Sequence, residues 1–141
     1  MSLKAYCDEK EMIRFEEGIF GFEKTKEYIA LPIEEGTADT LCLQSVEDED
    51  LSFLIVNPFS LDPTYDPKLS KEDLKALGTE NMDELVFYVI CIIAEKVENS
   101  TVNLKCPLVI HANKRIGIQA ILQTPDYTFK HFIGHLKEKE V

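Results

Sequence analysis

The side chains that could bind a metal ion or transfer a proton are few and scattered in this 141-residue chain. His131 and His135 have three residues between them, which is the spacing of half a zinc site. No cysteine pair accompanies them, and Gly134 weakens any helix that would present both rings on one face. We therefore interpret both histidines as partly exposed residues and expect no metal site.

His111, the third histidine, follows the apolar run Leu108-Val109-Ile110 and could face either a core or an interface. One histidine without a fixed acid or nucleophile partner is not a catalytic site. The chain also lacks G-x-S-x-G, P-loop and G-x-G-x-x-G motifs. The sequence therefore predicts a protein that is not an enzyme and uses no cofactor.

The densest run of charge is a stretch of four acidic residues, namely Glu47, Asp48, Glu49 and Asp50. Carboxylates can bind calcium, but this run lacks the spaced oxygen ligands and the glycine of an EF-hand loop. It separates the apolar runs Leu41–Val46 and Ser52–Asn57. Two such runs joined by a short polar stretch predict a hairpin, with the acids in a solvated turn.

The overall charge limits the kinds of partner. Acidic residues outnumber Lys and Arg by 26 to 15, for a net charge of −11. Such a protein is repelled by phosphate backbones and anionic membranes and attracted to basic protein surfaces. The charge is uneven, because residues 1–70 carry 16 acids against 6 bases and residues 71–141 carry 10 against 9. Solubility alone does not require that division, so we expect an acidic face in the N-terminal half.

Cysteine usage and apolar runs indicate the compartment. None of Cys7, Cys42, Cys91 and Cys106 belongs to a C-x-x-C pair, and no signal peptide precedes them. The longest apolar run, Leu85–Ala94, is too short to span a bilayer. We expect reduced cysteines and a cytoplasmic protein.

Hydrophobic periodicity predicts a mainly β chain in one domain, residues 1–141. Strands are expected at Met12–Glu16, Tyr28–Ile33, Leu41–Val46, Ser52–Asn57, Leu85–Ala94, Thr101–Lys105 and Ile116–Gln123. Leu85–Ala94 is apolar throughout and is predicted to be buried on both faces. Residues 57–67 hold three prolines and are expected to be a loop. From Tyr127 onward the chain could form a strand end or a short helix. This pattern favours an antiparallel barrel or sandwich with a short helical insert.

One helix has clear start and stop signals. Ser70 can cap it, with Asp73 completing a capping box. Leu69 and Leu74 are spaced as a hydrophobic staple, and Gly78 supplies the C-terminal stop. A helix this short must pack on the sheet to be stable.

Several strings along the chain resemble the motifs of the flagellar assembly factor FliW family. They are FEEGIFGF at 15–22, LQS at 43–45, FLIVNP at 53–58 followed by Tyr65, TVNLKCPL at 101–108, QAIL at 119–122 and YTFKH at 127–131. They occur in the family's order and cover nearly the whole chain. Two departures are small: Cys106 replaces the commoner alanine, and Lys130 stands where the family more often has arginine.

The resemblance implies a small antiparallel β-barrel with one or two short helices, and a cytosolic bacterial protein with two protein partners. One partner is flagellin, held before export. The other is the dimeric RNA-binding translational regulator CsrA, whose repression of the flagellin message is relieved when the assembly factor binds it. The free protein is expected to be a monomer. An acidic protein docked beside the regulator's basic surface would repel RNA, so reversing the charges at 47–50 and at Glu34–Glu35 should weaken this effect.

Candidate contacts with the partners are apolar or polar residues on turns and loops, together with the acidic run. They are Ile19, Phe20, Glu47, Asp48, Glu49, Asp50, Phe59, Tyr65, Asn103 and His111. Large apolar side chains are hard to bury in a turn bracketed by Gly18 and Gly21, which favours exposure of Ile19 and Phe20. The alternative is that these aromatics fold back over the barrel mouth, which we favour for Phe59 and Tyr65.

Two rival functions remain at this point. One is a small-molecule-binding barrel with a cleft lined by His111, Asn113 and Tyr127, although no paired acid and base support it. The other is a nucleic-acid-binding barrel, which the net charge opposes.

Overall fold

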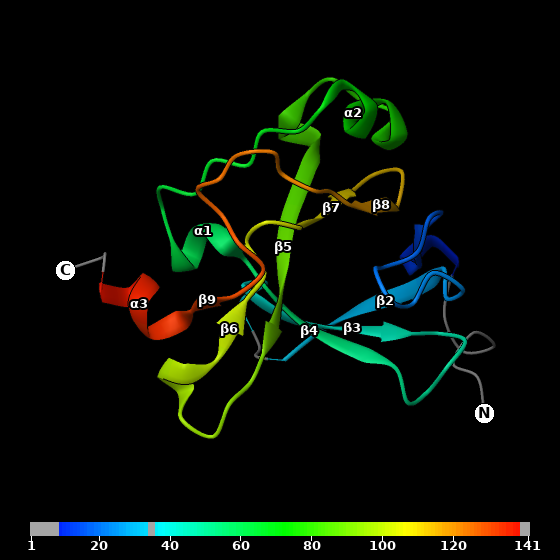
Figure 1. The fold of residues 1–141 in the computed structure, drawn as a ribbon. Helices are drawn as coiled ribbons and strands as arrows, with labels where there is room; N and C mark the ends of the chain where they lie inside the picture. The colour runs from blue at the N-terminus through cyan, green and yellow to red at the C-terminus, as the bar shows by residue number, and fades with distance from the viewer. Residues whose placement is uncertain (1–8, 34–35, 139–141) are drawn as a thin grey trace.

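The computed structural model describes residues 9–33 and 36–138 and shows a mainly β fold with a few short helices (Figure 1). The strands are β1 (Ile13–Phe15), β2 (Glu27–Pro32), β3 (Thr40–Ser45), β4 (Ser52–Val56), β5 (Leu85–Ile92), β6 (Thr101–Val102), β7 (Leu108–His111), β8 (Ile116–Gln119) and β9 (His131–Phe132). The helices are α1 (Pro58–Leu61), α2 (Lys71–Leu77) and α3 (Ile133–Glu138), with 3-10 turns η2 (Glu9–Glu11), η3 (Met82–Glu84) and η4 (Val97–Asn99).

Seven of the described strands close into a barrel, in the order β4-β3-β2-β1-β8-β7-β5, with β5 returning to β4. The pairing of β1 with β8 is parallel, and the other pairings among the described strands are antiparallel. The predicted barrel with short helices is therefore confirmed. Strands β6 and β9 extend the sheet beyond the barrel, and β9 lies at its edge.

The core has an interior and two outer layers. The barrel is filled by large side chains such as Phe15 and Tyr28, whose rings meet edge to face with centroids 5.7 Å apart. A second cluster joins the outer face of β5 to β6 and α3, and includes Tyr65 and Leu136. A third cluster packs Leu77 of α2 against Val109 and Ala120. In Figure 1, α2 covers one end of the molecule beside β7 and β8, and α3 lies beside β9.

The signals for α2 are confirmed in detail. The Ser70 hydroxyl accepts the Asp73 backbone N–H at 3.0 Å, and the Asp73 carboxylate accepts the Ser70 N–H at 3.1 Å. Gly78 ends the helix in the left-handed conformation with φ +72°. Leu69 and Leu74 both pack against the third cluster, so the staple also anchors the helix to the barrel.

Several sequence expectations need correction. The proline-rich loop at 57–67 contains α1, a single turn that Asn57 caps by accepting the Phe59 N–H at 2.9 Å. Strand β5 is not buried on both faces along its length, because Val86 and Ile92 near its two ends are exposed. Strand β6 stops at Val102, and after the Asn103 N–H has donated to the Ile90 carbonyl at 3.1 Å the chain leaves β5 to reach β7. The strand expected at Ile116–Gln123 likewise ends early, at Gln119.

The cysteines at 42, 91 and 106 are free, and burial raises the pKa values of the Cys91 and Cys106 thiols. Cys7, Glu34 and Glu35 lie outside the described residues. No helix in residues 9–33 and 36–138 has the length and apolar character that a membrane span requires. Within those residues, no three His, Cys, Asp or Glu side chains are placed to hold a metal ion.

Candidate functional site

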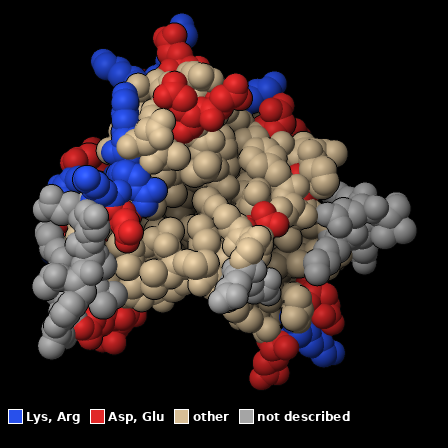
Figure 2. Space-filling model, turned by 180° about the vertical axis from the view of Figure 1, so that it is seen from behind, with Lys and Arg blue, Asp and Glu red and all other residues tan. Residues whose placement is uncertain are grey.

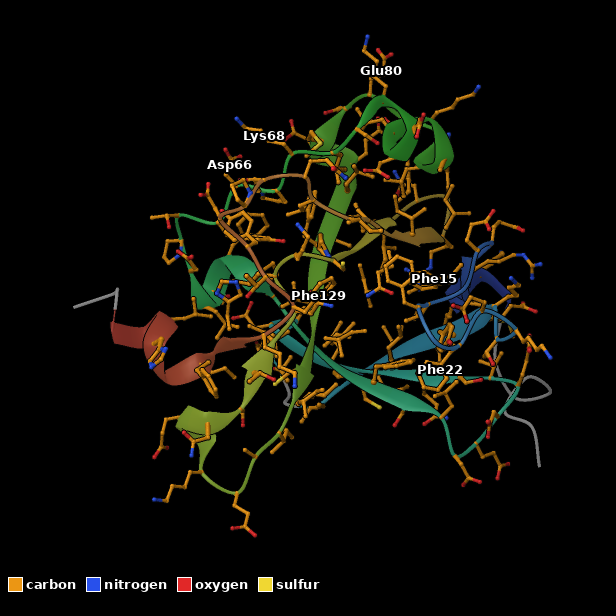
Figure 3. The ribbon with its side chains drawn as sticks, in the orientation of Figure 1. Phe15, Phe22, Asp66, Lys68, Glu80 and Phe129 are labelled. Carbon is orange, nitrogen blue, oxygen red and sulfur yellow. The ribbon has the colours of Figure 1, made fainter. Side chains whose placement is uncertain are left out.

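One end of the barrel, here called the mouth, brings together residues that are far apart in the sequence. Strands β1, β3, β5 and β8 end there, and β2, β4 and β7 begin there, as the pairing registers require. The chain crosses the mouth between β1 and β2 in a turn that contains Ile19 and Phe20. Figure 3 shows this side of the molecule, with Phe129 near its centre.

Ile19 and Phe20 point in opposite directions. Ile19 is only 1% exposed and packs in the barrel interior against residues such as Phe15, so the predicted exposure of Ile19 is wrong. The open mouth accepts its side chain, and the Phe22 N–H donates to the Ile19 carbonyl at 2.7 Å to hold the turn closed. Phe20 is 48% exposed, as predicted, and stands at the rim.

Beside Phe20 lies a hollow of about 350 Å³, here called the mouth groove. Its lining comes from the β1–β2 turn, β4, β5, β6, β8 and the segment before β9. The lining residues are Phe20, Phe53, Ile90, Ile92, Thr101, Asn103, Gln119, Phe129 and Lys130. Most of the family-like strings contribute a residue to this lining, which makes the mouth groove the leading candidate site.

A chain of hydrogen bonds fixes the rim of the groove. The side-chain Oε1 of Gln119 accepts the Phe20 backbone N–H at 2.9 Å, and its Nε2 donates to the Cys106 backbone carbonyl at 3.2 Å. The Asn103 side chain accepts the Cys106 N–H at 3.0 Å. The half-buried Asn103 side chain thus positions the backbone at Cys106, and Asn103 also lines the groove. Gln119 and Asn103 therefore hold Phe20 in place over a preformed surface.

The four acids at 47–50, here called the acidic turn, form the predicted hairpin turn between β3 and β4, and all four are exposed. The Ser45 hydroxyl accepts the backbone N–H groups of Glu47 and Asp48 at 3.1 and 2.9 Å. The Gln44 amide nitrogen lies within 3.4 Å of four carbonyl oxygens of the hairpin. The turn is therefore rigid, and it directs its carboxylates outward.

Further carboxylates belong to the same end of the barrel as the acidic turn. Glu16, Glu17 and Glu23 lie on the β1–β2 connection and Glu27 is the first residue of β2, and with the acidic turn they are here called the acidic rim. Arg14 neutralises part of it, pairing with Glu16 at 2.7 Å and Glu27 at 3.7 Å. Figure 2, seen from behind, shows Lys, Arg, Asp and Glu gathered at the margins of a largely uncharged face. Acidic and basic side chains are mixed along these margins (Figure 2).

The other predicted contact residues lie away from the groove. Phe59 is 40% exposed, but its ring packs on Tyr65 and Phe87 with centroids 5.7 and 5.9 Å away. Tyr65 is buried, in line with the alternative that it packs back against the barrel and is not a partner contact. Its hydroxyl donates to the Leu104 carbonyl at 2.7 Å. Burial raises the Tyr65 pKa well above its ordinary value. Tyr65 is therefore part of the folded core.

His111 is 1% exposed, so the structure does not offer it as a contact residue. Its Nδ1 accepts the Lys114 N–H at 3.1 Å, which leaves Nε2 to donate to the Glu84 carboxylate at 3.0 Å. Tyr127 lies elsewhere, with its ring 4.7 Å from that of Tyr65, and Asn113 is exposed in the β7–β8 turn. The cleft proposed for a small molecule is therefore not formed by these three residues.

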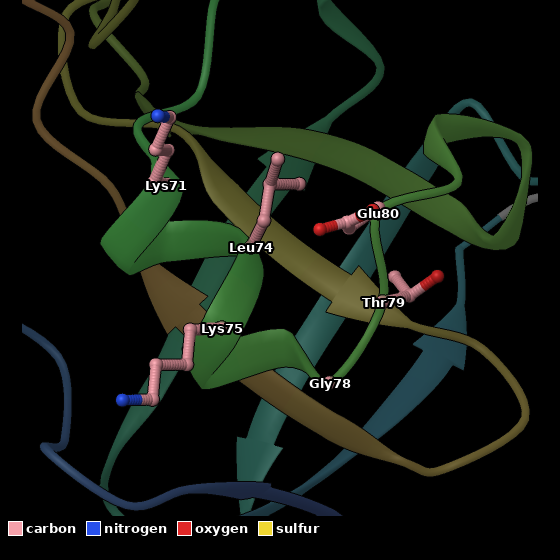
Figure 4. Close-up of a pocket in the computed structure, with 6 residues that line it drawn as sticks. All are labelled: Lys71, Leu74, Lys75, Gly78, Thr79 and Glu80. Atoms are coloured by element: carbon pink, nitrogen blue, oxygen red, sulfur yellow. The ribbon is translucent and has the colours of Figure 1, made fainter.

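A larger hollow of about 940 Å³ lies beside α2 (Figure 4). Its lining residues are Lys71, Leu74, Lys75, Gly78, Thr79 and Glu80, which all come from one continuous stretch of chain. It is a crease between a helix and the turn that follows it. Unlike the mouth groove, it does not bring distant segments of the chain together, and Leu74 is the one large apolar side chain in its lining. We therefore do not regard it as the functional site.

Sequence reasoning missed Phe129, which is 60% exposed and lines the mouth groove. No periodicity marks it, because it lies in an irregular segment between β8 and β9. Phe53, Gln119 and Lys130 belonged to the family-like strings, but nothing in one sequence indicated that they meet.

Comparisons with known proteins agree on one family. The family model described as "FliW protein" matches residues 3–133. The flagellar assembly factor FliW of Geobacillus sp. (strain WCH70) is 40% identical over 124 residues, covering 88% of this chain and 85% of the relative. The protein of the same name from Thermotoga neapolitana is 41% identical over 126 residues, covering 89% and 84%. A crystal structure of the flagellar assembly factor FliW superposes with a TM-score of 0.84 at 36% identity, covering 90% and 88%. The chain belongs to the FliW family.

Proposed function

We propose that this protein is a flagellar assembly factor that acts in the cytoplasm by binding two proteins in turn. It holds flagellin before export through the mouth groove. It also binds a CsrA-type RNA-binding regulator through the acidic rim and relieves repression of the flagellin message. The role rests on binding and not on catalysis. Membership of a family whose members are named flagellar assembly factors supports the general role.

The observation that carries the proposal is the mouth groove itself. Phe20 and Phe129 are large aromatic residues held half-exposed or more at a preformed hollow. Exposed aromatics around a pocket are typical anchors of protein–protein interfaces, because they contribute contact area with little loss of side-chain entropy. A hollow of about 350 Å³ at a barrel mouth can also admit a small molecule. The aromatic side chains exposed at its rim favour a protein partner.

The acidic rim supports the second partner. A protein that binds RNA must present basic surface, and an acidic protein is attracted to it. Once the protein is docked on the regulator, the carboxylates of its acidic turn would repel any phosphate group that approaches. RNA affinity would then fall without the RNA site being filled.

The direct test mixes the purified protein with purified flagellin and, separately, with the CsrA-type regulator of the same bacterium, and follows binding by calorimetry. We expect a stoichiometric complex with each. The proposed partners are refuted if neither protein binds in these titrations and neither is recovered in a native pull-down identified by mass spectrometry. The family assignment would remain intact.

Reversing the acidic turn is expected to impair antagonism of the regulator. A variant carrying Glu47→Lys, Asp48→Lys, Glu49→Lys and Asp50→Lys should need at least about tenfold more protein to displace RNA, because both attraction and phosphate repulsion are lost. The measurement is a competition titration with labelled flagellin leader RNA at fixed salt.

The matched control for this titration reverses four other exposed acids, namely Glu80, Asp83, Glu95 and Glu98. The total change in charge is identical, but these residues lie after α2 and on the β5–β6 connection and do not belong to the acidic rim. If the two variants lose antagonism equally, the effect comes from net charge and not from the acidic turn.

A further inference from the structure

We propose that the occupant of the mouth groove is an amphipathic α-helix with a carboxylate at one end of its contact surface and a basic side chain at the other. The carboxylate meets Lys130, and the basic group meets the acidic turn. This deepens the protein-binding role proposed above and rests on it. The argument concerns the chemistry of the segment that fits, and it holds for any partner that carries such a helix.

The pairing of the strands favours a helix over an extended segment. The strands that line the groove already have partners: β4 pairs with β3 and β5, β5 pairs with β4, β7 and β6, and β8 pairs with β7 and β1. Among the described strands, the open edge is β9, whose two residues do not line the groove. An extended peptide would find few backbone partners at the mouth, whereas a helix satisfies its own backbone hydrogen bonds and needs only a groove for its apolar face.

The lining supplies the apolar part of that recognition. Phe20, Ile92 and Phe129 are 48%, 64% and 60% exposed and stand around the hollow, while Phe53 and Ile90 form its deeper part. Side chains that recur every three or four residues on a helix face can enter such a hollow side by side. The volume admits only a few large side chains, which fits one face of a short helix.

The charges around the groove have opposite signs on its two sides. Lys130 is the one charged residue among the lining side chains, and no described carboxylate lies within ion-pair distance of its ammonium. On the other side, Phe53 contacts Phe22, with ring centroids 5.2 Å apart, and is the second residue of β4, the strand that follows the acidic turn. Figure 3 shows Phe22 between Phe129 and the outer end of the β3–β4 hairpin. A ligand that lies along the groove from Lys130 past Phe53 would therefore run from a cation toward the carboxylates of the acidic turn.

The test uses three stapled helical peptides of equal length with the same Leu and Phe face. They differ only in their end charges: one has a Glu pair at one end and a Lys pair at the other, one has Lys pairs at both ends, and one has Glu pairs at both ends. Each is titrated by fluorescence anisotropy against the full-length protein, the Lys130→Glu variant and the acidic-turn reversal variant. Stapling keeps helicity equal, so only the end charges vary.

The wild-type protein is expected to bind the peptide with mixed ends about tenfold more tightly than either other peptide. Lys130→Glu should shift the preference to the peptide with two Lys ends, and the acidic-turn reversal should shift it to the peptide with two Glu ends. The control Lys96→Glu has the same charge change on the exposed β5–β6 connection and should leave the preference unchanged.

Several outcomes overturn the inference. Tightest binding of the peptide with two Lys ends by the wild-type protein would show that only the net charge of −11 matters. Equal effects of Lys130→Glu and Lys96→Glu, or no binding of any peptide, would also refute it. Purified flagellin is titrated in parallel against the same variants. Peptide binding as expected without flagellin binding would refute the proposed partner and not the chemistry of the groove.

Discussion

Replacing both Phe20 and Phe129 by alanine is expected to weaken binding of flagellin about hundredfold. Both rings line the mouth groove, and truncating an aromatic residue that contributes to an interface commonly costs more than about 1 kcal/mol, so two losses of about 1.4 kcal/mol each give a hundredfold change. Because both side chains are about half exposed or more, the free energy of unfolding should change by about 0.5 kcal/mol or less. Isothermal calorimetry of the complex and urea unfolding of the free protein measure the two quantities.

The matched control replaces two apolar residues that are exposed elsewhere, Met82→Ala and Val97→Ala, which are 41% and 63% exposed. This variant also removes exposed apolar side chains but leaves the groove intact, so its affinity for flagellin should stay within about twofold of the wild type. Equal losses in the two double variants would show that flagellin does not depend on the groove.

Replacing Gly18 by alanine is expected to have the largest effect on the fold of the mouth. Gly18 has φ +71°, and a Cβ there would lie 2.5 Å from the Cα atom of Glu23. The left-handed conformation alone costs an alanine about 1–2 kcal/mol, and the backbone contact adds a clash that the turn cannot relieve. We expect a loss of about 3 kcal/mol in the free energy of unfolding, together with loss of flagellin binding, because the same turn carries Phe20.

Gly21→Ala separates backbone strain from the clash. Gly21 has φ +90°, but no other side chain or backbone segment lies within 4 Å of the place that a Cβ would take. Its replacement should therefore lower the free energy of unfolding by only about 1–2 kcal/mol. Urea unfolding of both variants provides the comparison, and similar losses would contradict the close approach of Glu23 to Gly18.

The elements that depend on local chemistry could be predicted from the sequence. Helix α2 is fixed by Ser70, Asp73 and Gly78, whose caps act within one turn of the chain. The β3–β4 hairpin follows from two apolar runs and an acidic connection between them. Ile19 could not be predicted in the same way, because its burial depends on a space that exists only once the strands have closed around it.

The residues of the candidate site likewise divide into those that local sequence predicts and those that only the closed barrel brings together. The acidic turn and Phe20 were predicted from their own segments, by charge and by bracketing glycines. Phe129 and Lys130 reach the groove only because β5, β6 and β8 bring their segment to the mouth. A single sequence holds no signal for such a meeting, because it depends on the closure of the barrel and not on any local propensity.

The parallel pairing of β1 with β8 joins Arg14 to Ile116, so the ring of strands cannot close until most of the chain has been synthesised. The last groove residue, Lys130, leaves the ribosome later still. A nascent chain therefore has no complete groove until residue 130 has left the ribosome, and the proposed capture of flagellin must wait for that point. The order of the strands thus delays partner binding until the N-terminal and C-terminal strands of the barrel have both been made and have paired.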